Sequence, residues 1–284
     1  MAEALTLVKE QARAQGVRRR ALIPTVILIV IVAACIFGPL VSPYPADALG
    51  VGLPFAGPSW AHWFGTDDLG RDLLSLVLVG GQISLTVGLG ATLISLLVGI
   101  AWGIAAAGRR GWIDTLLMRL CDAVMAIPQL LFALVCVAAF RPSVISLMIV
   151  IGLLMSPTTA RMVRSTAVSE LADDYVVAAT ASGLTRRRLL VSEVLPNILP
   201  PMVVQATTNM ADAIMLEATL SFVGLGIQPP DASWGTLLLQ GYAKMYNSIW
   251  MLIFPALIIV VTLACLVLLS DRLGSAFDGK KVMR

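Results

Sequence analysis

The chain of 284 residues is 58% hydrophobic and only 13% charged, with a mean hydropathy of +0.89 and a formal net charge of +3. This composition excludes an ordinary soluble domain and predicts an all-α protein embedded in a lipid bilayer, with no nucleic-acid partner. Hydrocarbon offers no water to the backbone, so each charge-free run of roughly 20 residues predicts one spanning helix. Six such intervals predict a polytopic membrane protein with about six transmembrane helices.

The N-terminal part of the chain is basic and then apolar. Residues 1–20 form a tail rich in Lys and Arg, and cationic tails tend to stay in the cytoplasm. We expect the first transmembrane helix at 21–42, retained as an anchor because no convincing Ala-x-Ala cleavage site follows it. Residues 43–81 then form an extracytoplasmic segment.

Four charged residues stand close together in that outer segment, namely Asp67, Asp68, Arg71 and Asp72. One interpretation is a cation site. The alternative, which we favour, is that Asp67 caps a helix and that the charges pair locally or meet a partner subunit.

The core domain is expected to cover 82–270 and to begin with a helix over 82–107. Small residues in a membrane helix let a second helix approach its backbone closely. We therefore predict close helix packing at four glycines of this helix: Gly88, Gly90, Gly99 and Gly103.

The next elements lie between charges that mark the membrane surfaces. Residues 112–122 are expected along the inner interface, where they carry three charges at helical spacing, Asp114, Arg119 and Asp122. A helix over 123–140 follows, with a kink at Pro128, and a helix over 143–160 returns the chain to the inside.

Residues 175–196 read YVVAATASGLTRRRLLVSEVLP and form the longest polar-interrupted interval between apolar runs on the predicted inner side. We call the loop 165–196 that contains them the knob. Helix formers run up to residue 182, and Gly183 stands where a helix C′ residue adopts the left-handed conformation. Thr185 can cap a second helix that carries three arginines, and Pro196 should limit that helix. The expected object is two short helices joined by a sharp glycine turn.

The chain continues with a helix over 196–222, an outer loop over 223–246, a helix over 248–269 and a tail over 271–284. This topology places both termini in the cytoplasm. Of the 20 Lys and Arg residues, it leaves outside only Arg71, Arg141 and Lys244. Such a bias supports both the helix count and the orientation.

The knob has a spacing that resembles a known signature. Ala178 and Ala179 are followed by Gly183 and then by Leu195 and Pro196, as in the EAA signature of importer permeases of the ATP-binding cassette class. Three further stretches look like the C-type permease subunit of dipeptide and oligopeptide importers: HWFGTDDLGRDLLSLVLVGGQISL from His62, GWIDTLLMRLCDAVMAIP from Gly111 and LEATLSFVGLGIQPPDASWG from Leu216.

This resemblance implies a type I ATP-binding cassette importer permease fold in the cell (inner) membrane, with the knob as a coupling helix in a groove of an ATPase subunit. It also implies a homologous B-type permease, two ATPase subunits and an extracytoplasmic substrate-binding protein as partners. The coupling residues that it implies are Tyr175, Val177, Ala178, Ala179, Ser182, Gly183, Leu184, Arg186 and Arg187. The sequence departs from the signature where Val177 replaces its glutamate and Glu193 replaces a His or apolar residue.

Two carboxylates fall inside the helix over 196–222, where an ionised side chain costs roughly 2.5 to 3.5 kcal/mol near the bilayer centre. Asp212 and Glu217 are about 140° apart on a helical wheel, whereas Met210 and Ile214 share the face of Glu217. One hypothesis is that Asp212 or Glu217, with Met210 on the latter face, borders a translocation pathway. The alternative is that both carboxylates only bond to neighbouring helices or outer-loop backbone.

No residue pattern indicates catalysis, a cofactor or a metal. Residues 274–280 nearly form a phosphate loop, but Lys281 replaces the Ser or Thr that would hold magnesium. The single His62 has no metal-ligating partners at suitable spacing, and neither HExxH nor GxSxG occurs. We therefore expect a transport subunit that is not an enzyme, with ATP hydrolysed on partner subunits.

The substrate stays open between classes. Within the same type of importer it could be a di- or oligopeptide, nickel, glutathione or another small solute, because a separate binding protein largely sets the choice. A rival of a different class is a self-sufficient secondary transporter or channel gated by Asp212 and Glu217, although the inverted repeats typical of such proteins are not apparent in the sequence.

Overall fold

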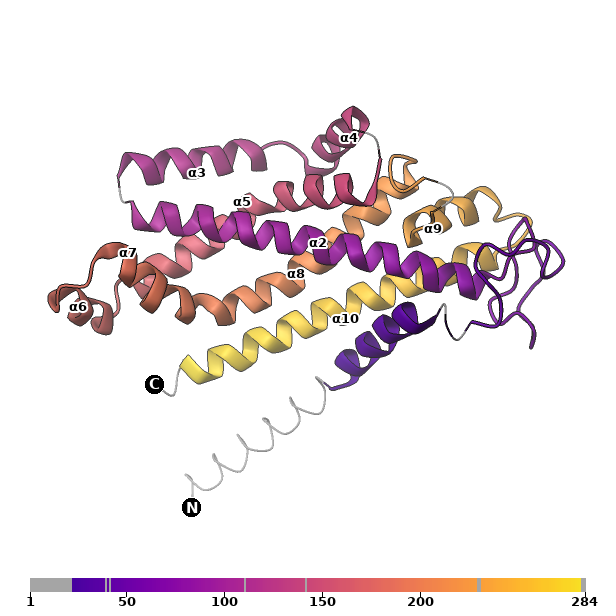
Figure 1. Cartoon of the computed structure of the whole chain (residues 1–284), viewed down its shortest axis with the longest axis horizontal. Helices are drawn as coiled ribbons and strands as arrows, with labels where there is room; N and C mark the ends of the chain where they lie inside the picture. The colour runs from indigo at the N-terminus through magenta and orange to yellow at the C-terminus, as the bar shows by residue number, and fades with distance from the viewer. Residues whose placement is uncertain are drawn as a thin grey trace, which may run out of the picture.

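The computed structural model describes residues 22–38, 40, 42–109, 111–140, 142–228 and 231–281. The tail predicted for residues 1–20 lies outside this part of the chain. Among the described residues the elements are helices, and the strand-like pairing is limited to one bridge between Thr66 and Asp72, so the all-α prediction is confirmed. Figure 1 shows an elongated bundle in which the longest helices run alongside one another.

Four of the described helices are long and apolar enough to cross a membrane. Three of them are α2 (Leu73–Gly108), α5 (Val144–Glu170) and α10 (Trp250–Lys281), and the fourth includes α8 (Leu195–Phe222).

The pair α3 (Trp112–Met125) and α4 (Gln129–Ala139) counts as one further span if the two helices cross the membrane together. The chain bends by 84° between them. The Leu22–Gly38 helix is apolar but shorter. The predicted spans therefore correspond, within the described residues, to four long helices, one broken pair and one short helix.

The start of α2 lies well before the predicted start at residue 82. Asp72 accepts hydrogen bonds at 2.9 Å from both the N–H and the hydroxyl of Ser75, so it is the N-cap of a helix that begins at Leu73. Asp67 instead accepts from the N–H groups of Leu69 and Arg71 inside a turn. The prediction that Asp67 caps a helix is wrong, whereas local charge pairing is confirmed by the 2.6 Å contact between Arg71 Nε and Asp67.

The helix predicted over 123–140 is not continuous. α3 ends at Met125, and α4 begins at Gln129 after an extended Pro128 with φ −55° and ψ 119°. Proline lacks an N–H and clashes with a preceding helical turn. The kink predicted at Pro128 is confirmed, and it is large enough to break the span.

The helix predicted over 143–160 continues to Glu170 as α5. Arg161 and Arg164, which follow the predicted end of this helix directly, pair with Asp122 and Asp114 of α3. Because a neighbouring helix neutralises these charges, they do not end α5.

The C-terminal part of the chain differs from its prediction in two places. The outer loop predicted over 223–246 contains α9 (Trp234–Ala243), which starts at a capping box formed by Ser233 and Thr236. α10 continues to Lys281, through most of the tail predicted over 271–284. Ser270 holds this stretch of α10 against α8, since its hydroxyl lies 2.8 Å from that of Thr208.

The most extensive helix–helix contact among the described residues joins α2 and α5. A Cβ added at Gly103 would lie 2.5 Å from the carbonyl oxygen of Ala160, and one at Gly99 would lie 2.6 Å from the Thr159 side chain. From the opposite helix, a Cβ at Gly152 would meet α2 at 2.7 Å. Real Cβ atoms do not make contacts this short, so the close packing predicted for the glycine pair of α2 is confirmed.

The α2–α5 contact yields a stability prediction. Gly103→Ala should force the two helices apart and lower the free energy of unfolding by roughly 1–3 kcal/mol. The matched control is Gly274→Ala in α10. A Cβ added at Gly274 would have its nearest contact at 3.9 Å, so this substitution should only gain helix propensity, by up to about 1 kcal/mol. Thermal unfolding of both variants in detergent measures the difference, and equal melting temperatures would contradict the packing argument.

Candidate functional site

The knob forms at one end of the bundle, where α5 ends and α8 begins (Figure 1). It contains α6 (Asp174–Ala181), a turn at 182–185 and α7 (Arg186–Arg188). Gly183 has a φ of +85° and donates its N–H to Thr180 O at 3.0 Å. The N–H of Leu184 reaches back to Ala179 O at 3.3 Å. These two bonds form a Schellman motif, so the left-handed turn predicted at Gly183 is confirmed.

The second helix of the knob differs from its prediction in two respects. Thr185 occupies the N-cap position but makes no side-chain capping bond. Pro196 does not end the helix, because α7 continues through a π-helix, η1 (Leu189–Val194), into α8. The wider π-helical turn is closed by a bond from Leu195 N–H to Leu190 O, and Pro196 falls in the first turn of α8, where a missing N–H is tolerated. The knob is therefore continuous with a spanning helix.

Two side chains of α6 attach it to the bundle. Val176 is 3% exposed and belongs to an apolar cluster that includes Ala167 of α5 and Ile198 of α8. The hydroxyl of Tyr175 donates to Glu170 Oε2 at 3.1 Å and accepts from Asn197 Nδ2 at 3.0 Å. Burial raises the pKa of Tyr175 above its ordinary value, so the hydroxyl keeps the proton that it donates. Tyr175 thereby ties α6 to the end of α5 and to the start of α8.

Most of the other predicted coupling residues face away from the bundle. Ala179 and Leu184 are half-buried, and the exposed ones are Ala178, Ser182, Gly183, Arg186 and Arg187. The backbone of Val177 belongs to α6, but its side chain lies outside the described part of the structure. Within that part, neither arginine has an ion-pair partner. The knob therefore presents a small-residue surface and positive charge to its surroundings.

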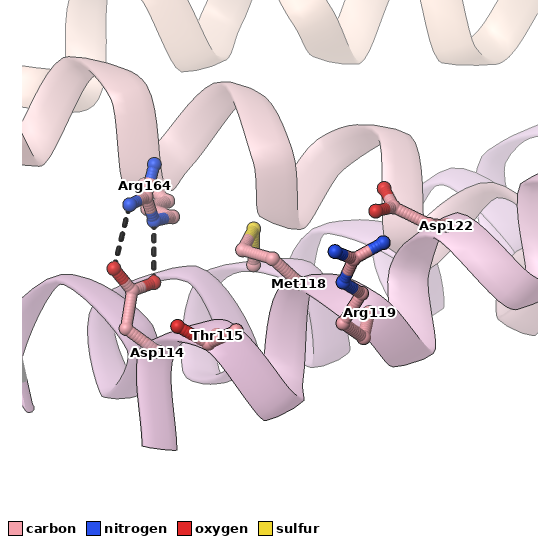
Figure 2. A pocket seen from close by; sticks show the side chains of 6 residues that line it. All are labelled: Asp114, Thr115, Met118, Arg119, Asp122 and Arg164. Carbon is pink, nitrogen blue, oxygen red and sulfur yellow. Dashed lines mark hydrogen bonds and ion pairs between the residues drawn. The ribbon is translucent and has the colours of Figure 1, made fainter. Parts of the chain in front are cut away.

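An open charged depression of about 280 Å³ lies between α3 and α5, as Figure 2 shows. Arg164 Nε and Nη2 contact the two oxygens of Asp114 at 2.5 and 2.6 Å, which is the bidentate geometry of a strong pair. Arg161 pairs with Asp122 nearby, and Arg119 contributes a further cation. These pairs fasten the first half of the broken span to α5.

Glu217 is enclosed by protein. Its side chain is fully buried, and its carboxylate accepts from Ser84 Oγ at 2.9 Å and from Ser221 Oγ at 2.7 Å. Ser84 Oγ in turn accepts a hydrogen bond from the backbone N–H of Trp234 at 3.1 Å. Glu217 thus joins α2, α8 and α9, an arrangement that favours the hypothesis of bonding to neighbouring helices.

Asp212 lies on another side of α8. Its side chain is exposed and lines a small depression with Gln129 of α4 and Thr158 of α5. Met210 is half-buried against an apolar cluster that contains Ile214, on the face toward α2. As the helical wheel predicts, Asp212 does not share the face of Glu217.

A buried polar network at the centre of the bundle was missed in the sequence. Asn209 Nδ2 donates to Ser95 Oγ at 3.2 Å and to Thr159 Oγ1 at 3.0 Å, and Gln205 donates to Asn209 Oδ1 at 2.8 Å. The spacing of Gln205 and Asn209 by one helical turn was a visible signal. Their partners on α2 and α5 are distant in sequence, so only the fold brings the network together.

Three comparisons place the chain among known proteins. The family model described as "Binding-protein-dependent transport system inner membrane component" matches residues 99–282. A putative peptide transport system permease protein of Brucella suis biovar 1 is 39% identical over 263 residues, which cover 93% of this chain and 88% of that relative. The di/tripeptide transport system permease protein of Pseudomonas aeruginosa is 36% identical over 259 residues, with 89% and 86% covered.

The fold also matches solved structures. A chain from inward-facing conformations of the MetNI methionine ABC transporter matches with a TM-score of 0.58 at 17% identity, covering 71% of this chain and 95% of that chain. At this identity the likeness concerns the fold alone.

The enclosure of Glu217 predicts a graded loss of stability. Glu217→Ala removes the acceptor of two buried hydroxyls and should lower the free energy of unfolding by roughly 1–3 kcal/mol. Glu217→Gln keeps the volume and one carbonyl acceptor, so its loss should be smaller. Thermal unfolding in detergent gives the order, and an unchanged melting temperature for Glu217→Ala would contradict a structural role.

Proposed function

Because the chain belongs to the family of binding-protein-dependent transport system inner membrane components, we propose that it forms half of the translocation pathway of an ATP-driven importer of di- and oligopeptides. The predicted resemblance to ATP-binding cassette importer permeases is confirmed by this membership. The observation that carries the finer proposal is the knob, an exposed and locally rigid element that continues directly into a spanning helix.

Peptides are proposed as substrates from the names of the relatives. The proteins at 39% and 36% identity are named for peptide and di/tripeptide transport, and this favours peptides over nickel, glutathione or another small solute. Membership in a binding-protein-dependent family also argues against the self-sufficient secondary transporter.

The knob is proposed to couple the permease to an ATPase subunit. Its Schellman turn and its apolar anchor at Val176 make it a compact body, and Tyr175 bonds it to α5 and α8 together. A displacement of the knob by a partner would therefore be passed to both helices as a rigid-body movement. ATP would be hydrolysed by the partner and not by this chain.

The proposed assembly contains a homologous B-type permease, two ATPase subunits and an extracytoplasmic substrate-binding protein in the cell membrane. Figure 1 places the C-terminal end of α10 at the same end of the bundle as the knob. This agreement supports the part of the topology inferred from charge in which the knob and the C-terminal tail are both cytoplasmic. The membrane core of this assembly would run from α2 to α10, with the outer segment ending at Asp72.

The glycine turn of the knob yields a test of coupling. Gly183→Val forces a β-branched residue to a φ of +85°, which costs roughly 1–3 kcal/mol and should displace α7. We expect the subunit to assemble in the membrane but to move roughly tenfold less peptide per ATP hydrolysed, since 1.4 kcal/mol corresponds to one factor of ten. Uptake and ATPase activity of the complex reconstituted in vesicles give this ratio.

The control for this experiment is Gly183→Asn. Space is not the problem at this position, because no atom lies within 4 Å of an added Cβ, and Asn tolerates the left-handed conformation better than β-branched residues do. Asn should therefore retain more coupling than Val. A valine variant with normal uptake per ATP would refute the role of the turn.

A further inference from the structure

We propose that Gln129, Thr158 and Asp212 form a subsite for the ammonium group of the transported solute, which for a peptide is its free amino terminus. The inference rests on the proposed function and adds to it the group of the substrate that this subunit recognises. It concerns the small depression on the side of α8 opposite to the enclosed Glu217.

The depression is built by three separate helices. Gln129 is the first residue of α4, Thr158 belongs to α5 and Asp212 belongs to α8, and all three side chains are exposed there. The break of the span at Pro128 is what brings the start of α4 to this place. Interrupted spans of this kind often surround substrate sites in membrane transporters.

The three polar side chains have unused hydrogen-bonding capacity. None of them makes a side-chain hydrogen bond or ion pair within the described residues. Asn209, which also lines the depression, is fully engaged with Ser95, Thr159 and Gln205. The side chain of Asn209 is therefore held in place and forms part of the lining, while Gln129, Thr158 and Asp212 are available to bind a ligand.

The chemistry of this set fits an ammonium group. An ammonium has three N–H donors, and the depression offers a carboxylate, a hydroxyl and an amide carbonyl as acceptors. The side chains of Met155 and Leu216 form apolar walls, which strengthen the attraction between the carboxylate and a cation. Asp212 brings the only charge of this lining, so the subsite has the opposite sign to an ammonium.

The size of the depression and the lack of a metal-ligating cluster in the described part of the chain argue against two other occupants, a whole peptide and a nickel ion. The cavity volume of about 40 Å³ admits a group the size of a water or an ammonium, and not a whole peptide. Among the described residues no cluster of three His, Cys, Asp or Glu side chains could hold a metal ion, so nickel is a poor fit. Every linear peptide has an amino terminus, so a subsite that binds this group would accept peptides whatever their side chains.

The test compares two peptides in the complete complex. The permease, its partner subunits and the binding protein are reconstituted in vesicles, and ATP-driven uptake of trialanine and N-formyl-trialanine is measured with the binding protein saturated by each. We expect the wild type to move trialanine roughly tenfold faster, as one charge-assisted hydrogen bond would allow. Asp212→Asn should abolish this preference by slowing trialanine alone.

Two variants serve as controls. Asp271→Asn removes an exposed carboxylate of α10, far along the chain from the depression, and should keep the wild-type preference. Asp212→Glu keeps the charge and should keep most of the preference. Equal slowing of both peptides by Asp212→Asn, or no slowing of either, would overturn the subsite.

Two further outcomes separate this inference from its premise. If Asp212→Asn prevents assembly with the second permease, the carboxylate pairs with a cation of that subunit, and the subsite proposal fails while the importer proposal stands. If the wild-type complex moves neither peptide with ATP, both proposals fail.

Discussion

The close contact between α2 and α5 is the constraint on which the rest of the bundle depends. Gly99 and Gly103 on one helix, and Gly152 on the other, leave no room for a Cβ, so the two backbones meet at a fixed distance. At that distance the hydroxyl oxygens of Ser95 and Thr159 lie 2.9 Å apart, and both accept a hydrogen bond from the side-chain amide of Asn209 in α8. Three spanning helices are thereby locked by glycine packing and one buried polar network.

The knob and the depression at Asp212 are joined through the same two helices. α5 carries Thr158 at the depression and ends at Glu170, while α8 carries Asp212 at the depression and Asn197 in its first turn. The hydroxyl of Tyr175 contacts both Glu170 and Asn197. A partner that moves the knob therefore acts on both walls of the depression at once, and this linkage is the physical basis proposed for coupling ATP hydrolysis to substrate movement.

Local signals in the sequence predicted local features well. Gly183 requires the left-handed turn, Pro128 requires a break, and the glycines of α2 require a close neighbour, because each of these effects depends on one residue type. The failures came from partners that are distant in the chain. Arg164 lies inside α5 because Asp114 of α3 pairs with it, and the predicted outer loop contains α9, whose Trp234 bonds to α2. Pro196 is a local exception: it does not end its helix, because a π-helical turn that leaves no sequence pattern leads into α8 just before it.

The central claim, that the knob docks on an ATPase subunit, is tested most directly by site-specific photocrosslinking in the assembled complex. A photoreactive side chain at Ala178, on the exposed face of α6, should crosslink to the ATPase subunit. The same side chain at Tyr246, which is 93% exposed beyond α9 on the predicted outer side, should not. A crosslink to the ATPase from position 246, or none from position 178, would contradict the account.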